Sequence, residues 1–78
     1  MSTLEKSIAR LLANPPEADF NDVRRVLKAH GWVQARQQGS HVHFTKEGER
    51  TITVPLRGKM VWRHYVREIC TRLGLAHD

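Results

Sequence analysis

The spacing of apolar residues predicts two helices in the first part of the chain. The first helix has an apolar face made of Leu4, Ile8, Leu11 and Leu12. Ser2 and Glu5 have capping-box spacing at its start, and the Asn-Pro-Pro segment at 14–16 ends it. A second amphipathic helix follows, from an N-cap at Asp19 to a left-handed exit at Gly31.

Alternating apolar and polar residues replace the helical spacing in the middle of the chain. They predict three strands, over residues 32–38, 41–45 and 51–55. In the second strand the alternation places His41, His43 and Thr45 on one face, and Val42 and Phe44 on the other. Each strand therefore has one face suited to a core and one suited to solvent.

The last periodic stretch predicts a helix that ends at Gly74. Its apolar stripe comprises Val61, Trp62, Tyr65, Val66, Ile69, Cys70 and Leu73. The order helix, helix, three strands, helix predicts an α+β fold, with a three-stranded antiparallel sheet whose apolar face is covered by helices.

Length and cysteine content limit the classes of protein. A chain of 78 residues is expected to form one domain, and it has no apolar run long enough to span a bilayer. Residues 1–12 lack the continuous apolar core that is typical of a signal peptide. A cytoplasmic protein without a membrane partner is expected. The single cysteine, Cys70, excludes an internal disulfide and a cysteine-based zinc cluster, and no cofactor is expected.

Charge narrows the range of partners. Thirteen Lys and Arg residues against eight Asp and Glu residues give a net charge of +5. Such a balance favours a polyanionic partner: nucleic acid first, an acidic protein second, a membrane surface third. Solubility alone is the alternative explanation.

Four stretches of the chain carry a resemblance to a known family. They are, in order, LKAHGW, RQQGSHVHF, TITVP and YVREICTRLG. From about Phe20 to Leu75 the chain is similar to HicA-type toxins, which are small bacterial mRNA interferases of toxin–antitoxin pairs. The expected division is an N-terminal helical extension, residues 1–18, followed by a HicA-like toxin domain, residues 19–78.

The resemblance implies a fold, an activity and a partner. The fold would be that of a double-stranded-RNA-binding domain, with one extra N-terminal helix here. The activity would be endonucleolytic cleavage of mRNA, neutralised by a HicB-type antitoxin that covers the active site in a hetero-oligomer. The family's catalytic histidine falls on His41. One departure is that Leu56-Arg57 follows Pro55, where many members have a histidine.

Metal-free RNA cleavage needs groups of the kind found around His41. A base must deprotonate a 2′-OH, an acid must protonate the departing 5′-oxygen, and cations must stabilise the phosphorane charge. Histidine suits either proton transfer because its unperturbed pKa is about 6.5. Ser40 is a candidate assisting donor to phosphate, whereas Gly39 either lets backbone approach a phosphate or simply forms a tight turn.

His43 is a weaker candidate than His41. Two residues apart on one strand face, the two rings could flank a phosphate as acid and base, but an ordinary exposed strand histidine is the favoured interpretation. A zinc site at His41 and His43 is disfavoured because it needs a third ligand, and the only nearby acids, Glu47 and Glu49, lie in a turn. No metal is therefore expected.

Basic residues around the predicted sheet are candidates for contact with RNA phosphates. They are Arg36, Lys46, Arg57 and Lys59, together with Gly39. The sequence supports phosphate contact by the cluster as a whole more strongly than by any single residue in it. Arg63 and Arg67 could extend this surface or meet acidic residues of an antitoxin.

Other residue types with possible chemistry are better explained by structure. Trp32, Trp62 and Tyr65 could stack on bases, but their apolar patterns favour core packing. Cys70 is expected in the core, His30 at a helix end, and His64 and His77 on the surface.

Two other functions remain open on sequence alone. The chain could be a non-catalytic RNA-binding module of the same fold, although Lys59 and Arg63 are not a dense lysine cluster at a helix start. It could also be an interaction protein whose basic face holds an acidic partner.

Overall fold

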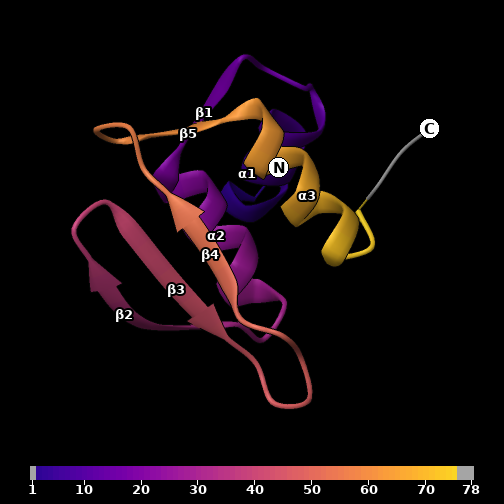
Figure 1. The fold of residues 1–78 in the computed structure, drawn as a ribbon. Helices are drawn as coiled ribbons and strands as arrows, with labels where there is room; N and C mark the ends of the chain where they lie inside the picture. Colours follow the sequence, from indigo (N-terminus) through magenta and orange to yellow (C-terminus); the bar gives the residue numbers. More distant parts are fainter. Residues whose placement is uncertain (1, 76–78) are drawn as a thin grey trace.

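The computed structural model describes residues 2–75, so the predictions for Met1 and His77 lie outside the described residues. The elements follow one another as α1 (Thr3–Leu12), β1 (Glu17–Asp19), α2 (Phe20–Ala29), β2 (Val33–Gln38), β3 (His41–Thr45), β4 (Ile52–Pro55), β5 (Met60–Trp62) and α3 (Arg63–Arg72). The predicted α+β class and the N-terminal helix are confirmed (Figure 1). None of the described helices has the length and apolar character needed to cross a membrane.

The central layer is an antiparallel sheet with the strand order β2-β3-β4. Strand alternation sends Val42, Phe44, Ile52 and Val54 into the core, where they are buried. The helices cover this inner face, as predicted (Figure 1). The outer face carries His41, His43 and Thr53 and, within residues 2–75, is covered by no helix.

Local signals explain where the first two helices begin and end. Ser2 and Glu5 form the predicted capping box, and the Asp19 side chain accepts a hydrogen bond from the Asn21 N–H at 2.7 Å. The chain leaves α2 through Gly31, whose φ of +88° is a conformation that glycine adopts without strain. These three predictions are confirmed.

The predicted start of the last helix is wrong. Val61 and Trp62 belong to β5, and α3 begins at Arg63 with Trp62 as its N-cap in an extended conformation. β5 pairs with β1, which the sequence did not predict, so that Ala18 lies opposite Val61. Val61 is buried through strand alternation, whereas Trp62 points outward and is 51% exposed. The expectation that Trp62 packs in the core is therefore also wrong.

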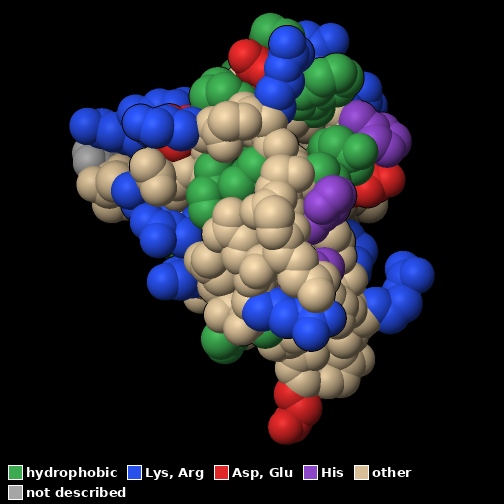
Figure 2. All heavy atoms as spheres, turned by 60° about the vertical axis from the view of Figure 1, so that its left-hand side comes forward, with side chains coloured by type: hydrophobic (Ala, Val, Ile, Leu, Met, Phe, Trp, Pro, Cys, Tyr) green, Lys and Arg blue, Asp and Glu red, His purple; other side chains and the backbone are tan. Residues whose placement is uncertain are grey.

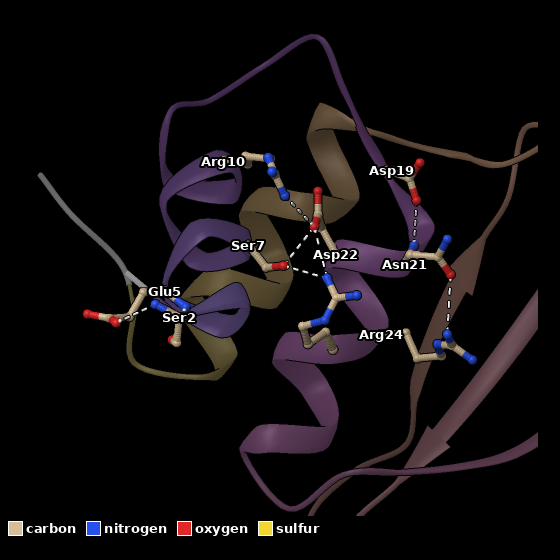
Figure 3. Close-up of polar contacts among 9 residues, drawn as sticks. Ser2, Glu5, Ser7, Arg10, Asp19, Asn21, Asp22 and Arg24 are labelled. Atoms are coloured by element: carbon tan, nitrogen blue, oxygen red, sulfur yellow. Dashed lines mark hydrogen bonds and ion pairs between the residues drawn. The ribbon is translucent and has the colours of Figure 1, made fainter.

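α1 packs against α2 around a polar cluster centred on the buried residues Ser7 and Asp22 (Figure 3). Asp22 of α2 accepts hydrogen bonds from Ser7 at 2.7 Å and from Arg10 at 3.0 Å, both on α1. Arg25 donates to Ser7 at 2.7 Å and lies 3.3 Å from Asp22. Leu11 joins the same core as the sheet residues, so α1 contributes both apolar and polar contacts to the fold.

Candidate functional site

His41 stands at the start of β3, on the open face of the sheet. It lies between Gln38 of β2 and Pro55 of β4 in the antiparallel register, and its side chain is exposed. Among residues 2–75 its ring has no hydrogen-bond partner. Both ring nitrogens of His41 are therefore available to a ligand on this face.

His43 shares that face but is held by its neighbours. Its Nδ1 lies 3.0 Å from the Thr53 hydroxyl, and its Nε2 is buried with no hydrogen-bond partner in the described structure. Its neighbours in the register are Arg36 of β2 and Thr53 of β4. The two histidines of the HVH segment thus differ: the His41 ring is free, and the His43 ring is tethered and covered.

Gly39 and Ser40 form the two-residue turn that presents His41. Gly39 has a φ of +59° at the first turn position, the pattern of a type II′ hairpin turn. The Ser40 carbonyl accepts a hydrogen bond from the Leu56 N–H at 2.7 Å, which ties the loop after β4 to this turn. A Cβ at Gly39 would meet no atom within 4 Å, so the space beside the turn is open.

Arg57, in the loop after β4, lies against the ring of Trp62 in β5 near the end of the sheet that carries His41. Arg57 and Met60 exchange two backbone hydrogen bonds, of 2.8 and 3.0 Å, across the turn that carries Lys59. The Arg57 guanidinium lies 5.4 Å from the centre of the Trp62 ring. Such a pair combines a cation with an exposed aromatic face, the two features that bind phosphate and stack on a base.

Sequence reasoning missed Trp62 as a surface residue. Its spacing fits the apolar stripe of α3, and that fit concealed its place in a strand. The alternation at Met60–Trp62 puts Val61 and Trp62 on opposite faces of the strand, but three residues are too short a signal to separate a strand from a helix in the sequence.

The predicted phosphate-binding residues do not all gather near His41. Arg36 neighbours His43 on the open face, and Arg57 and Lys59 lie in the loop that follows Pro55. Lys46 lies beyond the opposite end of β3, where its Nζ donates to the His30 carbonyl at 2.9 Å. This contact places a cation at the carboxyl end of α2, where it complements the helix dipole.

The remaining histidines, aromatic residues and cysteine lie away from this site. The His30 Nδ1 is 2.8 Å from the Val26 carbonyl, and the exposed His64 lies 3.4 Å from Glu68. Trp32 and Cys70 are buried, as predicted, and Tyr65 is half-buried. Burial raises the pKa of the Cys70 thiol, which keeps it protonated and unreactive at neutral pH.

On the face drawn in Figure 2, positive charge is distributed over several places and does not form one continuous patch. Figure 2 shows Lys and Arg side chains at several separate places around one face, with histidine side chains along one side of it. A groove lies between β4 and α3, and His41 is not among its lining residues. Within residues 2–75, no group of three or more His, Cys, Asp or Glu side chains is placed to hold a metal ion.

Comparison with known proteins assigns the chain to a family. Residues 20–75 match the family model described as the HicA toxin of bacterial toxin–antitoxin systems. Searches of curated proteins and of solved structures gave no match. The matched region runs from the start of α2 to just beyond α3 and contains the whole of the three-stranded sheet. The chain belongs to the HicA toxin family.

Proposed function

We propose that this toxin is an endoribonuclease that cleaves mRNA without a metal ion, with His41 as the general base or acid. The observation that carries the proposal is an exposed, unpartnered imidazole presented by a two-residue turn, with open space beside that turn. Such a ring can approach a ribose-phosphate unit without any rearrangement of the protein. Family membership adds the biological role of a toxin.

The reaction would proceed by transfer within the RNA strand. His41 removes the proton of a 2′-OH, the 2′-oxygen bonds to the adjacent phosphorus, and the bond from phosphorus to the 5′-oxygen breaks. The 5′-oxygen takes a proton from a water molecule, leaving a 2′,3′-cyclic phosphate on one product and a 5′-OH on the other. With the substrate bound in the opposite sense, His41 would instead supply the proton to the 5′-oxygen.

Other groups of the site would position the substrate. Arg57 is placed to neutralise phosphate charge as it develops in the transition state, while the Trp62 ring offers a stacking surface. Ser40 and Gly39 would line the phosphate path, and Arg36 would contact RNA beside His43. Lys59 would add a more distant phosphate contact, and Lys46 would contact only RNA that extends along β3.

His43 would assist indirectly. Its covered Nε2 cannot reach a phosphate in this conformation, so its role would be to position the outer face of β3 through its hydrogen bond with Thr53. We propose further that an antitoxin of the HicB type holds the toxin inactive by covering His41, and that the toxin acts on mRNA in the cytoplasm.

The experiment that tests this function uses chemically modified RNA. Wild-type protein is incubated with a single-stranded RNA and with the same sequence carrying 2′-O-methyl groups, both in the presence of a chelator. Cleavage of the unmodified RNA alone, with cyclic phosphate and 5′-OH ends, is expected. Equal cleavage of both RNAs, or products with 5′-phosphate ends, would overturn the mechanism. Binding without cleavage would favour the non-catalytic RNA-binding module.

A further inference from the structure

The free edge of the three-stranded sheet faces a basic groove that the proposed cleavage reaction does not use. β4 is the edge strand of this sheet (Figure 1). A groove of about 890 Å³ lies between β4 and α3. Four arginines line this groove: Arg50, Arg63, Arg67 and Arg72. Glu68 is the only acidic residue among its lining side chains. The groove therefore combines an unpaired strand edge with a strong excess of positive charge.

The register of β4 shows which backbone groups are unpaired. The Leu56 N–H donates to the Ser40 carbonyl of the β2–β3 turn. In an antiparallel pair every second residue directs its N–H and C=O to the same neighbour, so Val54 and Ile52 also direct their backbone groups toward β3. Thr53 and Thr51 therefore direct their N–H and C=O groups toward the groove. Among residues 2–75 these groups have no backbone partner. They form an alternating row of donors and acceptors.

Two of the arginines are free to receive a partner. Arg63 donates to the Pro15 carbonyl at 3.1 Å, and Arg72 donates to the Arg50 carbonyl at 2.7 Å and stacks over Trp32. The side chains of Arg50 and Arg67 are exposed and make no hydrogen bond or ion pair within the described residues. Arg63 and Arg72 thus help to hold the groove in shape, while Arg50 and Arg67 offer unpaired charge at its rim.

We propose that this groove is the docking site for an extended acidic segment of the antitoxin, which pairs with β4 as an additional strand. A peptide backbone satisfies both the donors and the acceptors of Thr51 and Thr53, and acidic side chains on it neutralise Arg50 and Arg67. Apolar side chains at alternate positions would meet Tyr65 and Ile69 on the groove wall. The inference rests on the pairing of this family with an antitoxin, not on catalysis by His41.

Two other occupants fit the groove less well. An RNA strand would bring phosphate oxygens against the outward carbonyls of β4 and against Glu68, where like charges repel. A second copy of this chain would place its own four arginines against these four, which opposes pairing of the two β4 edges. A peptide strand has backbone N–H groups for the β4 carbonyls, and its acidic side chains can lie beside the arginines and away from Glu68.

Docking at β4 would also bring the partner to the open face of the sheet. Adjacent strands lie about 4.8 Å apart, so a strand added beyond β4 extends the sheet that carries His41 and His43. Outward side chains of that strand would lie beside Thr53, the hydrogen-bond partner of His43. One segment of the antitoxin could therefore hold the toxin and cover part of the proposed active face.

Amide hydrogen exchange tests this strand pairing residue by residue. NMR exchange rates are measured for the toxin alone and in complex with its cognate antitoxin. The Thr53 amide should exchange rapidly in the free toxin and slow by about tenfold or more in the complex. The Val54 amide, which faces β3, serves as the internal control and should be protected in both states. Unchanged Thr53 exchange in the complex would overturn the proposal.

Charge reversal tests the acidic character of the segment. Arg50→Glu combined with Arg67→Glu should weaken antitoxin binding by about tenfold or more. The control, Lys6→Glu with Lys28→Glu, makes the same change in net charge at exposed residues outside the groove and should change affinity by less than about threefold. Equal losses in both double variants would overturn the proposal.

Two further measurements test whether RNA or a second copy of the chain occupies the groove instead. Protection of Thr53 by a single-stranded RNA bound to the His41→Ala variant, without protection by antitoxin, would assign the edge to nucleic acid. Protection that grows with the concentration of toxin alone would assign it to a second copy. Either outcome contradicts the proposal, and neither depends on whether His41 catalyses cleavage.

Discussion

At the scale of single residues, His41 and His43 show how neighbours separate two similar side chains. Both lie on the outer face of β3, as the alternation predicted. His41 sits beside a turn and stays exposed, whereas His43 lies between Arg36 and Thr53 and is half-buried. The alternation in the sequence predicts on which face of the sheet a residue lies. How far each histidine ring is buried depends on side chains from the two neighbouring strands, which the alternation does not predict.

His43→Ala and Thr53→Val test the positioning role of His43. Each variant removes the hydrogen bond between the two side chains, which should lower the free energy of unfolding by about 1–2 kcal/mol. RNA cleavage should fall by less than about tenfold, because the covered Nε2 does not reach substrate. Urea denaturation and cleavage rates measure both effects. A loss of activity as large as that of His41→Ala would instead give His43 a catalytic role.

The buried thiol of Cys70 should make stability depend on alkaline pH. Burial raises the pKa of this thiol above its ordinary value, so the folded protein holds the proton to higher pH than the unfolded chain does. The contribution of this thiol to the free energy of unfolding is fully present below the pKa that it has in the unfolded chain. It is lost as the pH rises through the pKa that it has in the folded protein.

Cys70→Ala isolates this contribution. The free energy of unfolding, measured in urea at pH 8 and at about pH 10.5, should fall further in the wild type than in the variant. Alkylation by iodoacetamide at pH 8 should be slow in the native protein and fast in urea. Rapid native alkylation would show that the thiol is accessible after all.

At the scale of elements, the sequence predicted those helices and strands that are marked by caps, turns or a long enough alternation of residues. Caps at Ser2 and Asp19 and the exit at Gly31 are encoded by neighbouring residues, and the structure contains all three. β1 and β5 could not be predicted in this way. Each is three residues long, and their pairing joins Ala18 to Val61, far away in sequence. Three residues are too few to distinguish alternation from helical spacing.

Asp22→Asn tests how firmly α1 is attached to the rest of the domain. Loss of the charge weakens the hydrogen bonds from Arg10, Arg25 and Ser7, because bonds to charged groups are the stronger ones. The free energy of unfolding of the variant should be lower by about 1–2 kcal/mol, which corresponds to a fall in Tm of about 4–16 °C. Calorimetry measures the shift.

Glu17→Gln provides the matched control for this prediction. It removes the same charge from an exposed residue of β1 and should change the free energy of unfolding by less than about 0.5 kcal/mol. Equal destabilisation by the two substitutions would mean that net charge, and not the contact between α1 and α2, determines the effect.

At the scale of the whole molecule, the net charge of +5 predicted a polyanionic partner but not where it binds. Lys46 is engaged at the end of α2, whereas Arg57 stacks on Trp62 near the turn before His41. Long-range packing decides these positions. The sequence could therefore predict the candidate residue His41 and the basic character around it, but not the pairing of Arg57 with Trp62.

Salt dependence should reveal how many cations contact RNA. In the His41→Ala variant, which is expected to bind RNA without cleaving it, contacts by Arg36, Arg57 and Lys59 should give a log–log slope of affinity against salt of about −2. Adding Arg57→Ala should reduce that slope by about 0.7, and adding Lys28→Ala on the surface of α2 should leave it unchanged. Fluorescence anisotropy measures the slopes; an unchanged slope without Arg57 would remove it from the RNA contact.

The most direct test of His41 catalysis is the rate of RNA cleavage in a chelator by wild type, His41→Ala and His64→Ala. His64 is an exposed histidine on α3 and serves as the matched control. His41→Ala should lose about 100-fold or more in rate while keeping the wild-type circular dichroism spectrum and Tm, and His64→Ala should cleave like the wild type. Wild-type cleavage by His41→Ala would contradict the assignment of His41 as the proton-transfer residue.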